Sequence, residues 1–215
     1  MREPVAILCR VFGTNAGSKP MPPPYCYDYP RPAVTVDLVV FAIRNDALRL
    51  LLIRRKHDPF AGHWALPGGF LEVDEPIEAG ARRELQEETG LVLAGPVDFL
   101  GVYGNPGRDP RGRTISLAHV SIIRGESPEV VGGDDAAEAA WLPARGDRGP
   151  LAFDHDEIVS HALRWLEDGV RSGRHQARFL PESLDETEAR SLLRIVLGDQ
   201  GTPREAGEGG YGFPQ

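Results

Sequence analysis

The stretch "GGFLEVDEPIEAGARRELQEETGL", residues 68–91, decides how this chain folds. Pro76 suits the first turn of a helix, because proline lacks the N–H group that a first turn leaves unpaired. Gly90 suits the position just after a last turn, where the backbone becomes left-handed. The stretch therefore predicts a helix over residues 76–89, with a Gly-Gly pair shortly before it.

Three glutamates share one face of this predicted helix. At about 100° per residue, Glu84, Glu87 and Glu88 fall within an arc of roughly 100°. A solvated charged face is one interpretation, but such a face normally alternates signs, and only Arg83 lies near the cluster. Converging carboxylates suit a hard divalent ion such as Mg²⁺, which prefers oxygen ligands. Gly69 lets the backbone approach the same point, so its carbonyl is a further candidate metal ligand.

Alternating and helical patterns surround this stretch. Apolar alternation and β-branched residues predict strands over 33–43, 48–55, 92–104, 114–124 and 137–143, with a turn at 44–47 and a charged loop over 105–113. Amphipathic patterns predict helices over 154–170 and 185–197. Asp154 followed by Glu157 predicts a capping box at the start of the first of these two helices.

Composition limits the function classes. The chain has 215 residues, 41% of them hydrophobic, which is enough for one compact domain with a small appendage. A net charge of -8 and a pI near 5.3 disfavour general affinity for nucleic acids or membranes. No apolar run approaches the ~20 residues that a membrane helix needs. Two cysteines without metal-ligand spacing indicate a cytoplasmic protein with free thiols.

The opening stretch is similar to a known motif. Gly69, Glu75 and the run from Arg83 to Leu91 match the Nudix box, G-x5-E-x7-R-E-U-x-E-E-x-G-U, at every fixed position. The resemblance covers about residues 33–170. It implies an α/β fold, the Nudix α/β/α sandwich around a mixed sheet, here with a short helical C-terminal appendage. It also implies hydrolysis of a nucleoside diphosphate linked to another moiety.

The resemblance assigns roles within the box. It implies that Glu84, Glu87 and Glu88 are metal ligands, that Arg83 holds a box glutamate in place, and that Glu75 is a supporting carboxylate. Mg²⁺, or Mn²⁺ as the alternative, would neutralise the pyrophosphate oxygens and lower the pKa of bound water.

Several family members place a further base outside the box. Glu138 and the pair Asp134–Asp135 are the candidates here, although a plain loop or strand-end role is the alternative for each.

Cationic and aromatic residues outside the box are the candidates for substrate binding. Guanidinium groups match phosphate oxygens bidentately, so we expect this role for Arg108 and Arg113 in the charged loop, and Arg111 remains open. Arg54 and Arg55 end the second strand, where one of the two faces each side of the sheet.

An aromatic ring near the box would stack on the nucleobase of the substrate. Phe70 is a candidate for stacking on it, as is Trp64, for which a core position is the alternative.

Several segments together resemble the ADP-ribose pyrophosphatase branch of the Nudix family. They are "YDYPRPAVTVD", "FAGHWALPGGFLE", "DPRGRTIS" and "FDHDEI". The implied reaction converts ADP-ribose, a small-molecule nucleotide substrate, to AMP and ribose 5-phosphate, while NADH and other nucleotides remain alternatives. Such hydrolases are often homodimers with exchanged N-terminal segments, a role that residues 21–32 could serve.

The same pattern also resembles Nudix-related regulators of NAD metabolism, which sense ADP-ribose and bind DNA through a winged helix. Residues 177–199 look like the start of that appendage, but the pattern predicts only an acidic, Gly-rich tail afterwards. Residues 182–215 hold three arginines and no lysine, whereas DNA binding needs clustered cations. Nucleic acid is therefore an unexpected partner. We expect an N-terminal segment over 1–32, a Nudix domain over 33–172, an appendage over 173–199 and a disordered tail over 200–215.

Overall fold

The computed structural model describes residues 30–123, 128–133, 136–175 and 186–198. The unit discussed below begins at Ala33. Most of the predicted N-terminal segment and the tail over 200–215 lie outside the described residues, and so do Asp134 and Asp135. Within the described part, no helix has the length and apolar character needed to cross a membrane.

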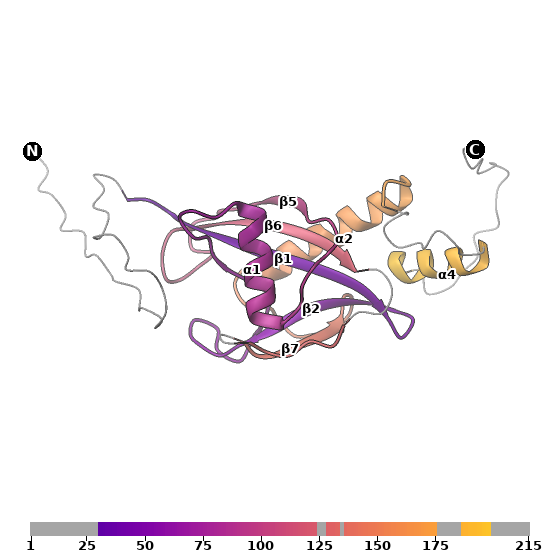
Figure 1. Ribbon diagram of the computed structural model, residues 1–215, viewed down its shortest axis with the longest axis horizontal. Helices are drawn as coiled ribbons and strands as arrows, with labels where there is room; N and C mark the ends of the chain where they lie inside the picture. The colour runs from indigo at the N-terminus through magenta and orange to yellow at the C-terminus, as the bar shows by residue number, and fades with distance from the viewer. Residues whose placement is uncertain (1–29, 124–127, 134–135, 176–185, 199–215) are drawn as a thin grey trace, which may run out of the picture. The chain divides into compact units, whose positions relative to one another are not determined.

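A seven-stranded mixed sheet forms the centre of this unit (Figure 1). Its strands are β1 (Ala33–Arg44), β2 (Ala47–Arg55), β3 (Trp64–Ala65), β4 (Gly68–Phe70), β5 (Asp98–Tyr103), β6 (Thr114–Ile123) and β7 (Ala136–Pro143). The predicted turn over 44–47 is confirmed: β1 and β2 form an antiparallel hairpin with a tight turn at Asn45 and Asp46, which both have positive φ. β6 runs parallel to β1, and this makes the sheet mixed.

Three helices are described: α1 (Ile77–Thr89), α2 (His155–Arg171) and α4 (Glu186–Leu197). The side chains of β1 separate two apolar cores, because successive residues of a strand point to opposite faces. Leu38 packs with Leu85 of α1 on one face. Val39 and Phe41 pack with Ile158 of α2 on the other. The predicted α/β/α sandwich is therefore confirmed.

Two short strands, β3 and β4, were not predicted from the sequence, and one predicted strand starts too early. Elements of two or three residues are too short to show a periodicity. β4 exists because Gly68 to Phe70 pair antiparallel with Thr35 to Asp37 of β1. The strand predicted over 92–104 begins only at Asp98. A Gly95-Pro96 pair precedes it and disfavours an earlier start.

The predicted capping box of α2 is wrong. Asp154 does occupy the N-cap position, but its side chain makes no capping hydrogen bond. Its carboxylate instead accepts two hydrogen bonds from the Arg108 guanidinium, at 2.8 and 2.6 Å. A charge-assisted bidentate pair is stronger than one bond to a backbone N–H group, so the ion pair takes the carboxylate.

Candidate active site

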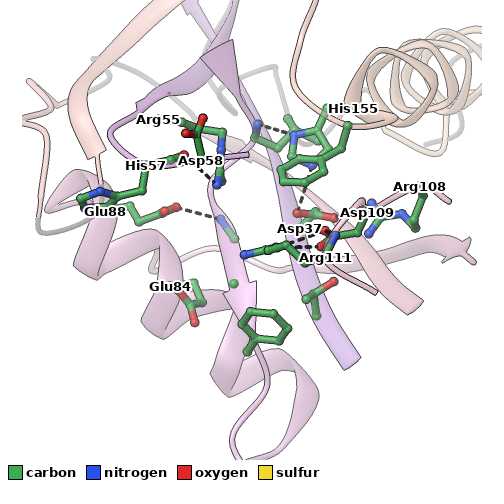
Figure 2. Close-up of a pocket in the computed structure, with 16 residues that line it drawn as sticks. Asp37, Arg55, His57, Asp58, Glu84, Glu88, Arg108, Asp109, Arg111 and His155 are labelled. Atoms are coloured by element: carbon green, nitrogen blue, oxygen red, sulfur yellow. Dashed lines mark hydrogen bonds and ion pairs between the residues drawn. The ribbon is translucent and has the colours of Figure 1, made fainter. Parts of the chain in front are cut away.

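A cavity of about 290 Å³ lies between α1, β4, the end of β2 and the loop over 105–113. Figure 2 shows Glu84 and Glu88 reaching it from α1, with Asp37, Arg108 and His155 grouped away from that helix. The cavity is lined largely by charged and aromatic side chains. The lining thus combines carboxylates, guanidinium groups and aromatic rings in one concave site.

Glu88 is the most buried of the three box glutamates, with 7% of its surface exposed. Its carboxylate accepts a hydrogen bond from the backbone N–H of Gly68 at 2.8 Å. Burial and, to a smaller extent, the nearby Glu84 raise the pKa of the Glu88 carboxyl to about 8, although the Gly68 N–H opposes the shift. A carboxyl with such a pKa would become ionised more readily beside a cation.

Glu84 lies directly against the Gly-Gly pair. A Cβ atom added to Gly69 would lie 2.5 Å from the Glu84 carboxylate, so any larger residue at position 69 would displace it. Burial also raises the pKa of Glu84, although Arg83 opposes the shift. Gly69 is therefore required for the close approach between β4 and the carboxylate face of α1.

Arg83 binds three carboxylates at once. Its guanidinium donates to Glu75 at 2.6 Å, to Glu84 at 2.9 Å and to Glu87 at 3.0 Å. It also donates to the carbonyl of Phe70 at 3.2 Å, which ties α1 to β4. The hydrogen bond from Arg83 lowers the pKa of Glu75. Arg83 thus fixes the direction of two of the predicted metal ligands, Glu84 and Glu87.

The three predicted glutamate ligands, Glu84, Glu87 and Glu88, do not surround one point in the structure. Among the described residues, no group of three His, Cys, Asp or Glu side chains is arranged as a metal site. Glu84 and Glu87 accept bonds from Arg83, while Glu88 accepts one from Gly68, and these partners hold the carboxylates apart. The donor set is nevertheless all oxygen, which suits a hard divalent ion.

A buried polar network borders the cavity opposite α1. Asp37 of β1 accepts a hydrogen bond from the hydroxyl of Ser116, and its other oxygen lies 3.5 Å from His155 Nε2. His155 Nδ1 accepts from the backbone N–H of Leu66 at 2.9 Å, so the neutral ring carries its proton on Nε2, facing Asp37. Burial lowers the pKa of His155, which favours that neutral form.

Arginine and aromatic side chains lie together in the cavity lining. Arg111 lies over the ring of Phe70, at 5.2 Å from its centroid, and over Phe153 at 5.7 Å. Arg55 lies over the other ring, Phe153, at 4.9 Å, and donates to the carbonyl of Pro59 at 2.8 Å. Phe70 keeps 40% of its surface exposed.

The structure brings only some of the predicted substrate-binding residues to the cavity. Arg55, Phe70 and Arg108 line it. Arg54 does not; it donates to the carbonyl of Gly62 and lies 3.8 Å from Glu138, with both side chains about half exposed. The predicted base Glu138 therefore lies beside Arg54, outside the cavity lining.

Arg113 and Trp64 also lie away from the cavity lining. Arg113 donates to the carbonyl of Gly104. Trp64 packs against the α2-side core, as the core alternative predicted.

Sequence reasoning missed several lining residues. Asp37 is a lone carboxylate in an apolar strand, and this was its one signal in the sequence. His155 lies in "FDHDEI", a segment used above only as part of a pattern. The remaining residues that were not singled out are Thr35, His57, Asp58, Leu66, Asp109 and Phe153.

Comparison with known proteins identifies the family. The NUDIX domain model matches residues 33–162. The ADP-ribose pyrophosphatase of Methanocaldococcus jannaschii is 44% identical over 137 residues, which cover 64% of this chain and 76% of that protein. The ADPR responsive transcriptional repressor NtrR of Acinetobacter baylyi is 32% identical over 174 residues, covering 80% of this chain and 69% of that protein.

A solved structure agrees with this assignment. The NUDIX domain of Shewanella oneidensis NrtR, crystallised in complex with ADP ribose, superposes with a TM-score of 0.59 at 31% identity and covers 64% of this chain and 90% of that chain. The box glutamates on α1, the sandwich around the mixed sheet and the family match over residues 33–162 together show that the chain belongs to the Nudix hydrolase family.

Proposed function

We propose that the protein hydrolyses the pyrophosphate bond of a nucleoside diphosphate derivative, with ADP-ribose as the preferred substrate and Mg²⁺ as the metal. The products would be AMP and ribose 5-phosphate. One observation carries the proposal: a single cavity is lined by the box glutamates Glu84 and Glu88 and also by arginine and phenylalanine side chains. The 44% identity to an ADP-ribose pyrophosphatase supports the choice of substrate.

The carboxylate side of the cavity is proposed to hold the metal. Glu84, Glu87 and Glu88 would be its ligands, together with the carbonyl of Gly69. Divalent ions, when bound, neutralise pyrophosphate oxygens and lower the pKa of the attacking water. Arg83 contributes by holding Glu84 and Glu87 on one face of α1 through its hydrogen bonds.

The opposite side is proposed to hold the nucleotide. The exposed ring of Phe70 lies beside the box and offers a face for a purine. Arg55 reaches the cavity from the end of β2, where its charge would attract phosphate oxygens. A substrate bound between these groups and α1 would place its pyrophosphate beside the glutamates.

Glu88→Gln tests the catalytic part of the proposal. The amide keeps the size of the side chain but removes a charged ligand, so we expect the fold to persist and kcat to fall by about 10² or more. The assay measures phosphate-ester products from ADP-ribose, NADH, NAD⁺ and ATP with Mg²⁺, with circular dichroism as the check on folding. Glu78→Gln, on the same helix but outside the cavity, is the matched control. Wild-type-like turnover by Glu88→Gln would place the metal elsewhere.

A second candidate function is ADP-ribose sensing. Its support is the 32% identity to a transcriptional repressor over 80% of this chain. A sensor would bind ADP-ribose without turning it over and would bind duplex DNA with an affinity that falls steeply with salt. Rapid turnover of ADP-ribose together with no DNA binding in low salt would favour the enzyme.

A further inference from the structure

The loop over 105–113 carries three arginines that have different surroundings. The side chain of Arg108 is 4% exposed and that of Arg111 is 38% exposed. Arg113 donates to the carbonyl of Gly104, away from the cavity lining. A ligand that enters the cavity would therefore reach the exposed Arg111 side chain more easily than the buried Arg108 side chain.

Arg108 is occupied by two carboxylates from other elements. Its guanidinium donates to both oxygens of Asp154 at the start of α2, at 2.8 and 2.6 Å. It also donates to Asp37 of β1 at 3.5 Å. Arg108 also lines the cavity. Because its N–H groups donate to Asp37 and Asp154, it attaches the loop to the sheet and to α2.

The ion pair replaces a helix cap. Asp154 stands at the N-cap position of α2, where a carboxylate usually accepts a bond from a backbone N–H of the first turn. Here it makes no such bond and is directed at Arg108 instead. The start of α2 thus lacks a side-chain capping hydrogen bond, and the Asp154 carboxylate binds the loop through Arg108 instead.

Arg111 follows Arg108 in the loop and is aimed at the cavity. Its guanidinium donates to the buried carboxylate of Asp109 at 3.0, 3.2 and 2.7 Å. The backbone N–H of Arg111 also donates to Asp109, which closes the turn between them. The Arg111 guanidinium lies over the exposed ring of Phe70, so it borders the place proposed for the nucleotide.

We propose that Arg111 is the arginine of this loop that contacts the phosphate or ribose oxygens of the substrate, and that Arg108 is a positioning residue that acts through it. The Arg108–Asp154 pair holds the loop so that Arg111 stands beside Phe70. This inference rests on the proposed function, because it concerns how the same cavity binds its nucleotide. It changes the role expected for Arg108 from a direct phosphate ligand to an indirect one.

A double-mutant cycle distinguishes direct from indirect action. Arg111→Met should raise the KM for ADP-ribose by about tenfold or more and leave kcat within about threefold, because the carboxylates on α1 are unchanged. Arg108→Met should also raise KM. The double variant should show a KM no higher than that of Arg111→Met alone, because both substitutions remove the same interaction, the contact between Arg111 and the substrate. If the two effects multiply instead, Arg108 binds substrate independently and the proposal is wrong.

Further variants keep the test decisive. Arg108→Met leaves Asp37 and Asp154 without their cation, so folding is checked by thermal melting. Asp154→Asn is the milder substitution, and its KM effect should likewise disappear in the Arg111→Met background. Arg164→Met, an exposed arginine of α2 outside this cavity, is the matched control for loss of positive charge. A rise in KM for Arg113→Met without one for Arg111→Met would overturn the assignment.

The outcomes also separate this inference from the proposed function. If wild-type protein does not cleave ADP-ribose, the proposed function fails before any variant is compared. If wild type cleaves it and Arg111→Met keeps the wild-type KM, the function stands and only the assignment of the arginines fails.

Discussion

At the scale of single residues, one guanidinium organises the box. Arg83 pairs with Glu75, Glu84 and Glu87 within 3.0 Å, so one cation partly offsets the repulsion among the carboxylates. Glu88 lies outside this group and is bonded to the backbone of Gly68 instead. The box therefore contains two kinds of carboxylate, those held by Arg83 and one held by burial and a backbone N–H.

The contact between Gly69 and Glu84 predicts that even a methyl group at position 69 is harmful. In Gly69→Ala the new Cβ would lie 2.5 Å from the Glu84 carboxylate, which must move away. We expect a loss of kcat of about tenfold or more, because metal-site geometry is sensitive to small displacements. Gly95→Ala is the control, since its Cβ would meet only Ile122 O at 3.9 Å. Equal activity of the two variants would remove Gly69 from the site.

The buried Glu88 carboxyl predicts a pH dependence of stability in metal-free protein. Its pKa rises from 4.5 to about 8 on folding, so the folded state binds more protons than the unfolded state between these values. The stability that this group contributes is present below the unfolded pKa and is lost as pH rises through the folded pKa. We expect the melting temperature in EDTA to fall more steeply with rising pH for wild type than for Glu88→Gln.

The comparison between the two proteins isolates Glu88 from other titrating groups. The difference in melting temperature, variant minus wild type, should grow from pH 5 to pH 8, a window set by the shifted pKa. Mg²⁺ should reduce this difference, because it binds the ionised carboxylate. If the melting temperatures of the two proteins change with pH in parallel over this range, Glu88 ionises in the folded protein as it does in the unfolded chain.

At the scale of elements, α4 belongs to the core of the described unit. Val196 is fully buried in the same cluster as Ile158 and Leu166 of α2. The sequence placed this helix in an appendage that resembles the start of a winged helix. Its packing against α2 and β2 means that the helix adds stability to the Nudix unit itself.

Val196→Ala should therefore destabilise the protein. Removing two buried methyl groups costs about 1–3 kcal/mol through lost burial and the cavity that remains. Urea unfolding followed by tryptophan fluorescence measures the change in the free energy of unfolding. Val92→Ala is the matched control, because Val92 is 69% exposed. Equal unfolding midpoints for the two variants would show that α4 does not stabilise the fold.

The elements show where sequence reasoning succeeds. The helix predicted over 76–89 is α1 within one residue, because Gly90 ends it with a left-handed φ of 70°. The capping-box prediction was wrong because Asp154 pairs with Arg108, which is 46 residues away in the chain, and no local sequence pattern reveals that partner. β4 failed for a similar reason: it is defined by its pairing with β1, and its own residues do not favour a strand.

At the scale of the whole molecule, the sequence grouped the carboxylates of the candidate site better than the residues on the opposite side of the cavity. The box lies in one continuous stretch, so its spacing alone groups Glu84, Glu87 and Glu88. The opposite side of the cavity gathers residues from β1, the 105–113 loop and α2, whose proximity depends on sheet order. The sequence pattern therefore could not predict that Arg108 and Arg111, but not Arg113, line the cavity. The homodimer and the cytoplasmic location remain predictions.

The parallel pairing of β1 with β6 also has a consequence for how the chain reaches its folded state. Partners in this ladder, such as Ala33 and Thr114, are 81 positions apart in the chain. Closing so long a segment is entropically costly, so such contacts form late and slowly, whereas the β1–β2 hairpin can form locally. Because the 105–113 loop leads directly into β6, the side of the cavity that this loop lines should be completed only in this late step. During refolding, hairpin structure should thus appear before the ability to bind nucleotide.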